Sequence, residues 1–211
     1  MSIKHAVSIA AGLLAIAIPV TASPAAAQTC ELHVWPTEAL GAATQGSHMG
    51  GLLPALMAGS TTAQMETLGQ VLDTRGQIEQ LRKMDLVTGF GLPEGTRIIY
   101  HEQEPFSDAR GRAAPSQPPC YYDFKVDQIV FNRHPVYGKD ILAFFSFRQF
   151  GTGEKPVFKE SGRFRTKMPQ FPKIEPANIV EMSGKMNAAF ATDVTLFSAR
   201  VRARTKPSRR N

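Results

Sequence analysis

The residues best suited to chemistry form a short polar cluster after a predicted strand. His101, Glu102 and Glu104 lie close together, Asp108 follows shortly after, and His134 lies further along the chain. Imidazole and carboxylate groups together can bind a divalent metal or transfer a proton. Matches this short arise often by chance, and a solvated acidic loop is the simpler interpretation. A small periplasmic hydrolase or metal-assisted enzyme using this region is therefore the alternative hypothesis.

No established catalytic motif accompanies this cluster. The chain contains no G-x-S-x-G nucleophile elbow, no H-E-x-x-H zinc motif and no G-x-G-x-x-G dinucleotide motif. The sequence therefore predicts no catalytic residue, no metal ligand and no cofactor, although it leaves the question of enzymatic activity open.

The first 27 residues have the three parts of a secretory signal peptide. A short basic start containing Lys4 precedes an apolar run over residues 6–20, and small residues end at Ala27. We predict cleavage near Ala27 and a periplasmic or secreted product that begins at Gln28. An uncleaved N-terminal anchor is the alternative, but the apolar run is shorter than the roughly 20 residues that span a bilayer.

The two cysteines of the chain are Cys30 and Cys120. An even number of cysteines in an exported chain predicts one disulfide, because the compartment is oxidising. Closing so long a loop contributes roughly 4–5 kcal/mol in the loop-entropy model. The two residues are too far apart for a C-x-x-C redox pair, and they supply too few ligands for a zinc site.

The positive charge of the chain is concentrated at its C-terminus. Between Gln28 and Ala199 there are 17 basic and 18 acidic residues, so this part is nearly neutral, whereas the whole chain has a net charge of +6. Residues 200–211 are predicted to be a disordered basic tail. The tail contains six cations and no acid: Arg200, Arg202, Arg204, Lys206, Arg209 and Arg210.

A second set of cations is predicted on a strand. Arg163, Arg165 and Lys167 alternate along the chain, so their side chains would project from one side of a strand and extend the basic area. An anionic lipid, lipopolysaccharide or peptidoglycan is the predicted partner of both sets. A solvated edge-strand face is the alternative interpretation. Nucleic acid is not expected as a partner in an exported protein.

The stretch from Ala39 to Met65 contains no charged residue and five glycines. One interpretation is a buried, irregular connection under the core. The other is a surface for a protein partner or for self-association, since exposed apolar patches in monomers often mark such surfaces.

Hydrophobic periodicity predicts an α+β fold over residues 28–199. Alternation predicts a strand at Cys30–Trp35, with Leu32 and Val34 on one face and His33 and Trp35 on the other. Further strands are predicted at residues 97–101, 122–131, 141–148 and 157–164, with a bulge in the second of these and a turn over residues 132–140. A Pro-, Ser- and Gly-rich segment near residues 102–119 is predicted to be an exposed, mobile loop.

Helical spacing predicts short helices beginning near Thr61 and Asp73 and a long final helix over residues 177–202. The stripe of the final helix consists of Ile179, Met182, Met186, Phe190, Val194, Phe197 and Val201. The predicted fold is thus a small antiparallel sheet of about four or five strands packed against this helix and one or two shorter ones. The main functional hypothesis is an exported, non-catalytic envelope protein that binds an anionic surface or a protein partner.

Overall fold

The structure is a computed structural model that describes residues 29–38, 40–44, 62–103, 111–115, 118, 120–134 and 138–205. The predicted signal peptide and its cleavage site lie outside the described residues. So do Glu104, Asp108, the last six residues with Lys206, Arg209 and Arg210, and most of the uncharged stretch from Ala39 to Met65.

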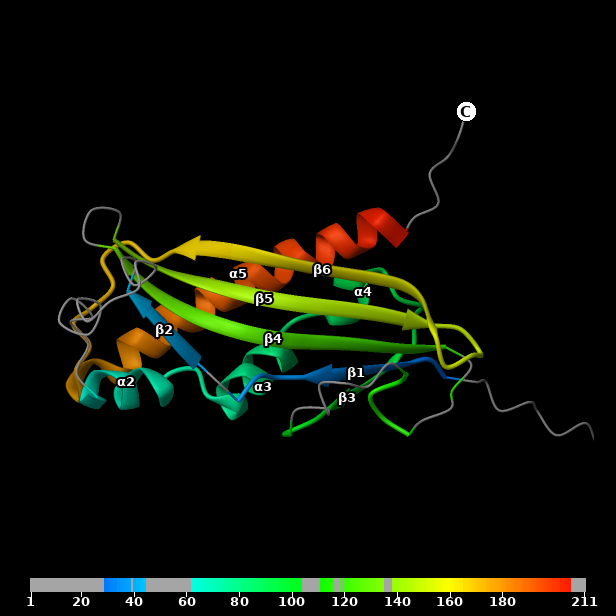
Figure 1. Cartoon of the computed structure of the whole chain (residues 1–211), viewed down its shortest axis with the longest axis horizontal. Coiled ribbons are helices and arrows are strands. Elements are labelled where there is room, and N and C mark those ends of the chain that lie inside the picture. Colours follow the sequence, from blue (N-terminus) through cyan, green and yellow to red (C-terminus); the bar gives the residue numbers. More distant parts are fainter. Residues whose placement is uncertain are drawn as a thin grey trace, which may run out of the picture.

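The described strands form one six-stranded mixed sheet with the order β3-β1-β4-β5-β6 (Figure 1). The sixth strand, β2, pairs with the same edge of β4 as β1 does, further along that strand. The strands are β1 (Glu31–Trp35), β2 (Leu40–Thr44), β3 (Arg97–Tyr100), β4 (Tyr121–His134), β5 (Gly138–Phe150) and β6 (Pro156–Lys167). The long strands β4, β5 and β6 are antiparallel. The three short strands make parallel pairs, β1 with both of its neighbours and β2 with β4.

The helices lie on one face of this sheet, which we call the inner face (Figure 1). They are α2 (Thr62–Gly69), α3 (Thr74–Arg82), α4 (Leu86–Phe90), the short 3₁₀ helix η1 (Pro176–Asn178) and α5 (Ile179–Thr205). The predicted α+β fold with a long C-terminal helix is confirmed. The parallel pairs differ from the antiparallel sheet expected, because alternation along a strand reveals which face a residue occupies and not the direction of its partner.

Local signals explain where the short helices begin and end. The Asp73 carboxylate accepts a hydrogen bond from the Gly76 N–H at 2.7 Å, and Asp85 caps α4 in the same way through Thr88. Helix α4 ends at Gly91, whose φ of 70° is left-handed. A Cβ atom there would lie 2.9 Å from Cγ of Arg202 on α5, so glycine allows both the turn and the close approach of the two helices.

The inner face carries the main hydrophobic core. Leu32 and Val34 of β1 point into it, and the predicted stripe of α5 is buried from Met182 to Val201. Phe197 is central, because its ring lies 5.3 Å from the ring of Phe145 and 6.0 Å from that of Phe124. The stripe therefore builds the domain core, as its spacing predicts.

Strands β4 and β5 are longer than predicted. The register shifts between Val126 and Gln128, which confirms the bulge, and pairing then continues to His134 opposite Gly138. Most of residues 132–140, expected as a turn, is therefore strand. A hydrogen bond of 2.8 Å from the Asn132 amide to the Asp140 carboxylate supports this polar end of the ladder.

Among the described residues, no helix combines the length and the apolar composition that crossing a bilayer requires.

Candidate functional site

The outer face of the sheet, opposite the helices, carries a buried polar cluster around β1. Glu31, His33 and Trp35 alternate with the core residues of β1 and are 5%, 3% and 7% exposed. Polar side chains of β3, β4 and β5 and of the segment after β3 lie around them. We call this group the histidine cluster, and it consists of Glu31, His33, Trp35, Arg97, His101, Tyr121, Asp123 and Arg148.

A chain of hydrogen bonds runs through the two imidazoles. His33 Nδ1 lies 2.8 Å from His101 Nε2, and His33 Nε2 lies 3.2 Å from Glu31 Oε2. The Arg97 guanidinium donates to the other Glu31 oxygen. The His101 ring stacks on the Trp35 indole at 3.6 Å between centroids and 6° between planes. His101 therefore fastens the chain after β3 to the outer face of β1.

The other half of the cluster centres on Asp123. The Tyr121 hydroxyl donates to Asp123 Oδ1 at 2.7 Å, and the Arg148 guanidinium donates to Oδ2 at 2.6 Å. The same hydroxyl accepts the Ala114 N–H at 2.9 Å. Burial, followed by the Asp123 charge, raises the pKa of the Tyr121 phenol. Tyr121 therefore stays protonated and links Ala114 to the sheet.

Burial also governs the two imidazoles. It lowers the pKa of His33, and the Glu31 carboxylate opposes this shift without reversing it. Burial and the neighbouring His33 lower the pKa of His101. Both rings are therefore neutral at neutral pH, which suits a hydrogen bond in which one ring donates and the other accepts.

Residues 111–114 of the predicted loop 102–119 pack against the sheet beside this cluster, whereas Glu102, Gln103 and Pro115 of the same loop are exposed as predicted. Ala114 is 8% exposed and forms a small apolar group with Trp35, Tyr121 and Phe150. The Arg112 guanidinium donates to the Gly151 carbonyl at 2.8 Å. Composition indicated an exposed segment, but Ala113 and Ala114 pack against the aromatic outer face, and the Ala114 N–H donates to the Tyr121 hydroxyl.

The residues of the alternative enzyme hypothesis that the structure describes are His101, Glu102 and His134, and they do not form one site. His101 turns to His33 and Trp35, whereas Glu102 is exposed. Glu102 lines a surface hollow of about 540 Å³ beside α3, together with charged residues such as Glu79 and Arg82. His134 ends β4 opposite Gly138. Among the described residues, no three His, Cys, Asp or Glu side chains are grouped to hold a metal.

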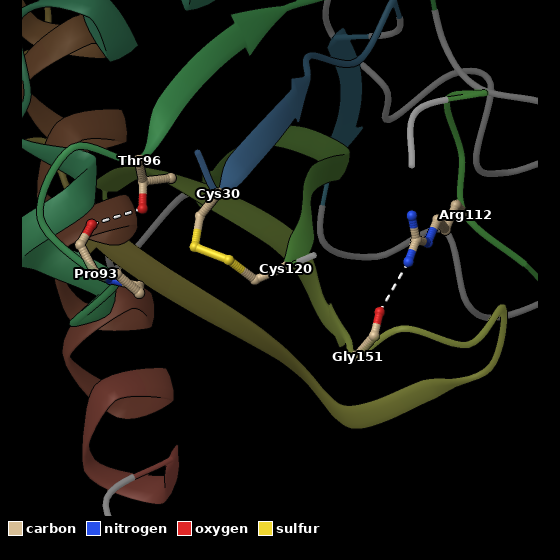
Figure 2. Close-up of a disulfide and its surroundings, with 6 residues drawn as sticks. All are labelled: Cys30, Pro93, Thr96, Arg112, Cys120 and Gly151. Carbon is tan, nitrogen blue, oxygen red and sulfur yellow. Dashed lines mark hydrogen bonds between the residues drawn. A yellow bond between two sulfur atoms is a disulfide. The ribbon is translucent and has the colours of Figure 1, made fainter. Parts of the chain in front are cut away.

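The predicted disulfide between Cys30 and Cys120 is confirmed, with the two Cα atoms 4.8 Å apart (Figure 2). Each cysteine directly precedes a strand, β1 or β4, and the Glu31 N–H donates to the Cys120 carbonyl at 3.0 Å. The Arg97 N–H donates to the Cys30 carbonyl at 2.9 Å on the other side. The disulfide therefore fastens the starts of two adjacent parallel strands, next to the histidine cluster.

The cations of the predicted basic tail that the structure describes belong to α5. The helix extends to Thr205 because its last turns are held by the sheet. Arg200 Nε lies 2.8 Å from Glu160 Oε1, and the Arg204 guanidinium donates to Glu160 Oε2 at 2.6 Å. Arg202 donates to the Thr88 carbonyl at 3.3 Å. A buried glutamate thus engages two of these three cations.

The cations of β6 behave differently. Arg163, Arg165 and Lys167 are all exposed on the outer face, as their alternation predicts. Arg165 Nε lies 3.5 Å from Asp140 Oδ1. Arg163 and Lys167 have no ion pair with any carboxylate of the described residues. Strand β6 therefore presents a run of exposed cations on the outer face of the sheet.

No protein-family model and no curated protein matches the chain. Solved structures similar to it include a Xanthomonas campestris protein of family DUF330, at 8% identity and a TM-score of 0.42, covering 89% of this chain and 88% of that one. A structure of the PelC dodecamer from Paraburkholderia phytofirmans is 12% identical, with a TM-score of 0.32 and 86% and 92% covered. A minor lipoprotein from Acinetobacter baumannii is 8% identical, with a TM-score of 0.34 and 82% and 93% covered. At such low identities and TM-scores, these similarities assign no function.

Proposed function

We propose that this chain is an exported cell-envelope protein that acts by binding, as an accessory or assembly protein in contact with an anionic envelope surface or a protein partner. The disulfide between Cys30 and Cys120 carries the proposal. Disulfides persist in oxidising compartments such as the periplasm and are rare in the cytosol. The leader of residues 1–27 supports the same compartment, because it has the three parts of a secretory signal peptide.

The binding part of the proposal is supported by the distribution of charge. The exposed cations of β6 belong to a regular strand of the sheet, so they form a fixed surface rather than a frayed chain end. For the uncharged stretch of residues 39–65, β2 shows that one part adds a strand to the sheet beside β4. A role for the rest of that stretch in binding a protein partner or a second copy stays a prediction.

The compartment is tested by intact-mass spectrometry of protein from fractionated cells, with thiol alkylation before and after reduction. We expect the periplasmic or secreted protein to begin at Gln28 and to take up no alkyl group until it is reduced. A Cys30→Ser variant is the matched control, because it leaves Cys120 open to alkylation without reductant. A full-length N-terminus with both cysteines alkylated in the unreduced protein would overturn the proposed export.

A further inference from the structure

The outer face of β6 carries a row of exposed cations. Lys159, Arg163 and Lys167 are exposed and make no ion pair with any carboxylate of the described residues. We call these three residues the cationic edge. With a rise of about 3.4 Å per residue, the edge extends over about 27 Å. It is therefore long enough to contact several anionic groups at once.

The acids on the same face are already engaged by other partners. Arg148 binds Asp123 at 2.6 Å, and Asp127 accepts a hydrogen bond from Ser146 at 3.0 Å. Asp140 accepts from Asn132 and lies 3.5 Å from Arg165. The positive charge of the cationic edge is thus available to a ligand.

An apolar strip runs beside the cationic edge on the outer face. Phe144 lies opposite Arg163 in the β5–β6 pair, and Leu142 lies opposite Arg165. Val130 of β4 continues the strip, because it is paired with Leu142. We call Val130, Leu142 and Phe144 the apolar strip, and each of these side chains is partly exposed. All helices described by the structure pack on the opposite face (Figure 1).

We propose that this face binds the surface of a membrane that contains anionic phospholipids. The cationic edge contacts the lipid phosphates, and the apolar strip contacts the region where headgroups meet acyl chains. An anionic phospholipid has a negative phosphate next to hydrocarbon, and this complements the cationic edge next to the apolar strip. This inference names the anionic surface of the proposed function and rests on the export of the chain.

The arrangement favours a lipid surface over the other anions considered. A single small anion would need converging donors, whereas these cations alternate along an extended strand and point the same way. An acidic polypeptide would satisfy the charges but leave the partly exposed Phe144 and Leu142 without a matching partner. The lipid surface is therefore the partner that contacts both the cationic edge and the apolar strip.

The experiment is flotation of the exported, processed protein with vesicles of mixed phosphatidylglycerol and phosphatidylcholine, at low and high salt. We expect binding to the mixed vesicles, and weaker binding at high salt because exposed charges are screened. The variant Lys159→Gln/Arg163→Gln/Lys167→Gln should bind roughly tenfold to a hundredfold more weakly, since each cation near an anionic surface contributes several-fold. Pure phosphatidylcholine vesicles should bind no variant well.

The matched control removes the same charges elsewhere. Arg75→Gln/Lys83→Gln/Lys173→Gln also neutralises one arginine and two lysines, all exposed, and should retain most of the binding. If both triple variants lose binding equally, only net charge matters and the proposal fails. A truncation after Thr205 separates the edge from the terminal cations. If that truncation abolishes binding and the edge variant does not, the ligand surface is the tail.

The apolar strip is tested by Phe144→Ser. The control is Leu196→Ser, on the solvent-exposed side of α5. Leu196 is 49% exposed, so its change should leave vesicle binding unchanged. We expect Phe144→Ser to weaken binding severalfold. If the protein bound soluble polyglutamate as tightly as it bound the mixed vesicles, an acidic protein partner would be indicated and the lipid assignment would be overturned. Because export is decided separately by intact mass, failure of lipid binding leaves that result in place.

Discussion

The inner and outer faces of β1 are both buried, but different interactions hold them. On the inner face, Leu32 and Val34 pack into an aromatic core beneath α5. On the outer face, His33 and Glu31 are buried by hydrogen bonds and by stacking with their neighbours. Apolar packing depends little on pH, whereas a buried hydrogen-bonded imidazole depends on its protonation state. The outer face should therefore respond to conditions that leave the inner face unchanged.

The inner face also contains buried polar side chains. Asp193 of α5 is fully buried, and its Oδ1 atom accepts a hydrogen bond from the Thr166 hydroxyl at 2.6 Å. Its Oδ2 atom has no hydrogen-bond partner among the described residues. Burial raises the pKa of Asp193 to about 6, with the nearby Asp140 charge adding to the shift. Each face thus holds a titrating group, and the two kinds of group shift in opposite senses.

The largest expected effect comes from breaking the link between β1 and β4. The double variant Cys30→Ser/Cys120→Ser removes a bridge between residues 90 apart in sequence, and we expect it to lose roughly 4–5 kcal/mol of unfolding free energy. Denaturant unfolding with and without reductant measures the loss. Hydrogen exchange should rise first in β1, which the bridge fastens to β4, and in β3, which pairs with β1, and last in β5. A variant with unchanged stability would show that strand pairing alone holds the β1 end of the sheet.

The second prediction compares the two faces with the same substitution. Phe197→Ala removes a fully buried ring at the centre of the inner core and should destabilise the protein by about 3–5 kcal/mol. Phe144→Ala removes a partly exposed ring from the outer face and should cost less than about 1.5 kcal/mol. Similar losses in thermal or denaturant unfolding would mean that the apolar strip is part of the structural core, and the membrane-binding proposal would lose one of its two supports.

The elements that could be predicted are those with local signals. The buried stripe of α5 can be predicted from the spacing of residues such as Met182, Met186 and Phe190 alone. The start of α3 can be predicted from Asp73, which is a capping residue. Strand β2 gave no such signal, because Leu40–Thr44 contains two alanines and a glycine, and only its pairing with β4 makes it a strand. The direction of the short strands likewise depends on neighbours that are distant in sequence.

The histidine cluster was missed for the same reason. His33 and His101 are separated by 68 positions, and only the pairing of β1 with β3 brings them together. The signal that could have found it is the placement of His33 and Trp35 on the face opposite Leu32 and Val34. A histidine between two apolar residues of a short strand indicates a second buried face when that strand is central. The sequence neighbours Glu102 and Glu104 instead favour a metal-binding or proton-transfer interpretation of His101.

The third prediction concerns the buried carboxyl of the inner face. Because the folded state raises the Asp193 pKa from 3.8 to about 6, folding favours the protonated form, and stability falls as the pH rises through this window. Asp193→Asn keeps an acceptor for the Thr166 hydroxyl and removes the charge. We expect it to stabilise the protein by about 2 kcal/mol above about pH 7 and by little near about pH 4.

Thermal unfolding across pH measures this effect, and Thr166→Val is its control. Removing the hydrogen bond that Asp193 Oδ1 accepts from the Thr166 hydroxyl should raise the carboxyl pKa further and strengthen the pH dependence. An Asp193→Asn protein whose stability keeps the wild-type pH profile would assign the dependence to another group.

The smallest expected effect has the opposite sign and belongs to the outer face. Burial lowers the folded-state pKa of His33 and His101 below 6.5, so the stability that the neutral rings contribute is complete above that pH and is lost as the pH falls through the folded values. The charged or titratable groups facing the rings include Glu31, Arg97, Asp123 and the Tyr121 phenol, whose ring stacks on His33. Mild acid should therefore loosen the histidine cluster while it strengthens the packing of α5.

Trp35 reports this change directly, because it is the single tryptophan of the chain and it stacks on His101. We expect its fluorescence to change with a midpoint below 6.5, ahead of global unfolding. His101→Phe keeps a ring on the indole and should reduce the amplitude of the change, whereas Asp193→Asn, on the other face, should leave it intact. If Asp193→Asn altered the Trp35 titration as much as His101→Phe does, the two faces would not respond independently, and the contrast between them would be limited to composition.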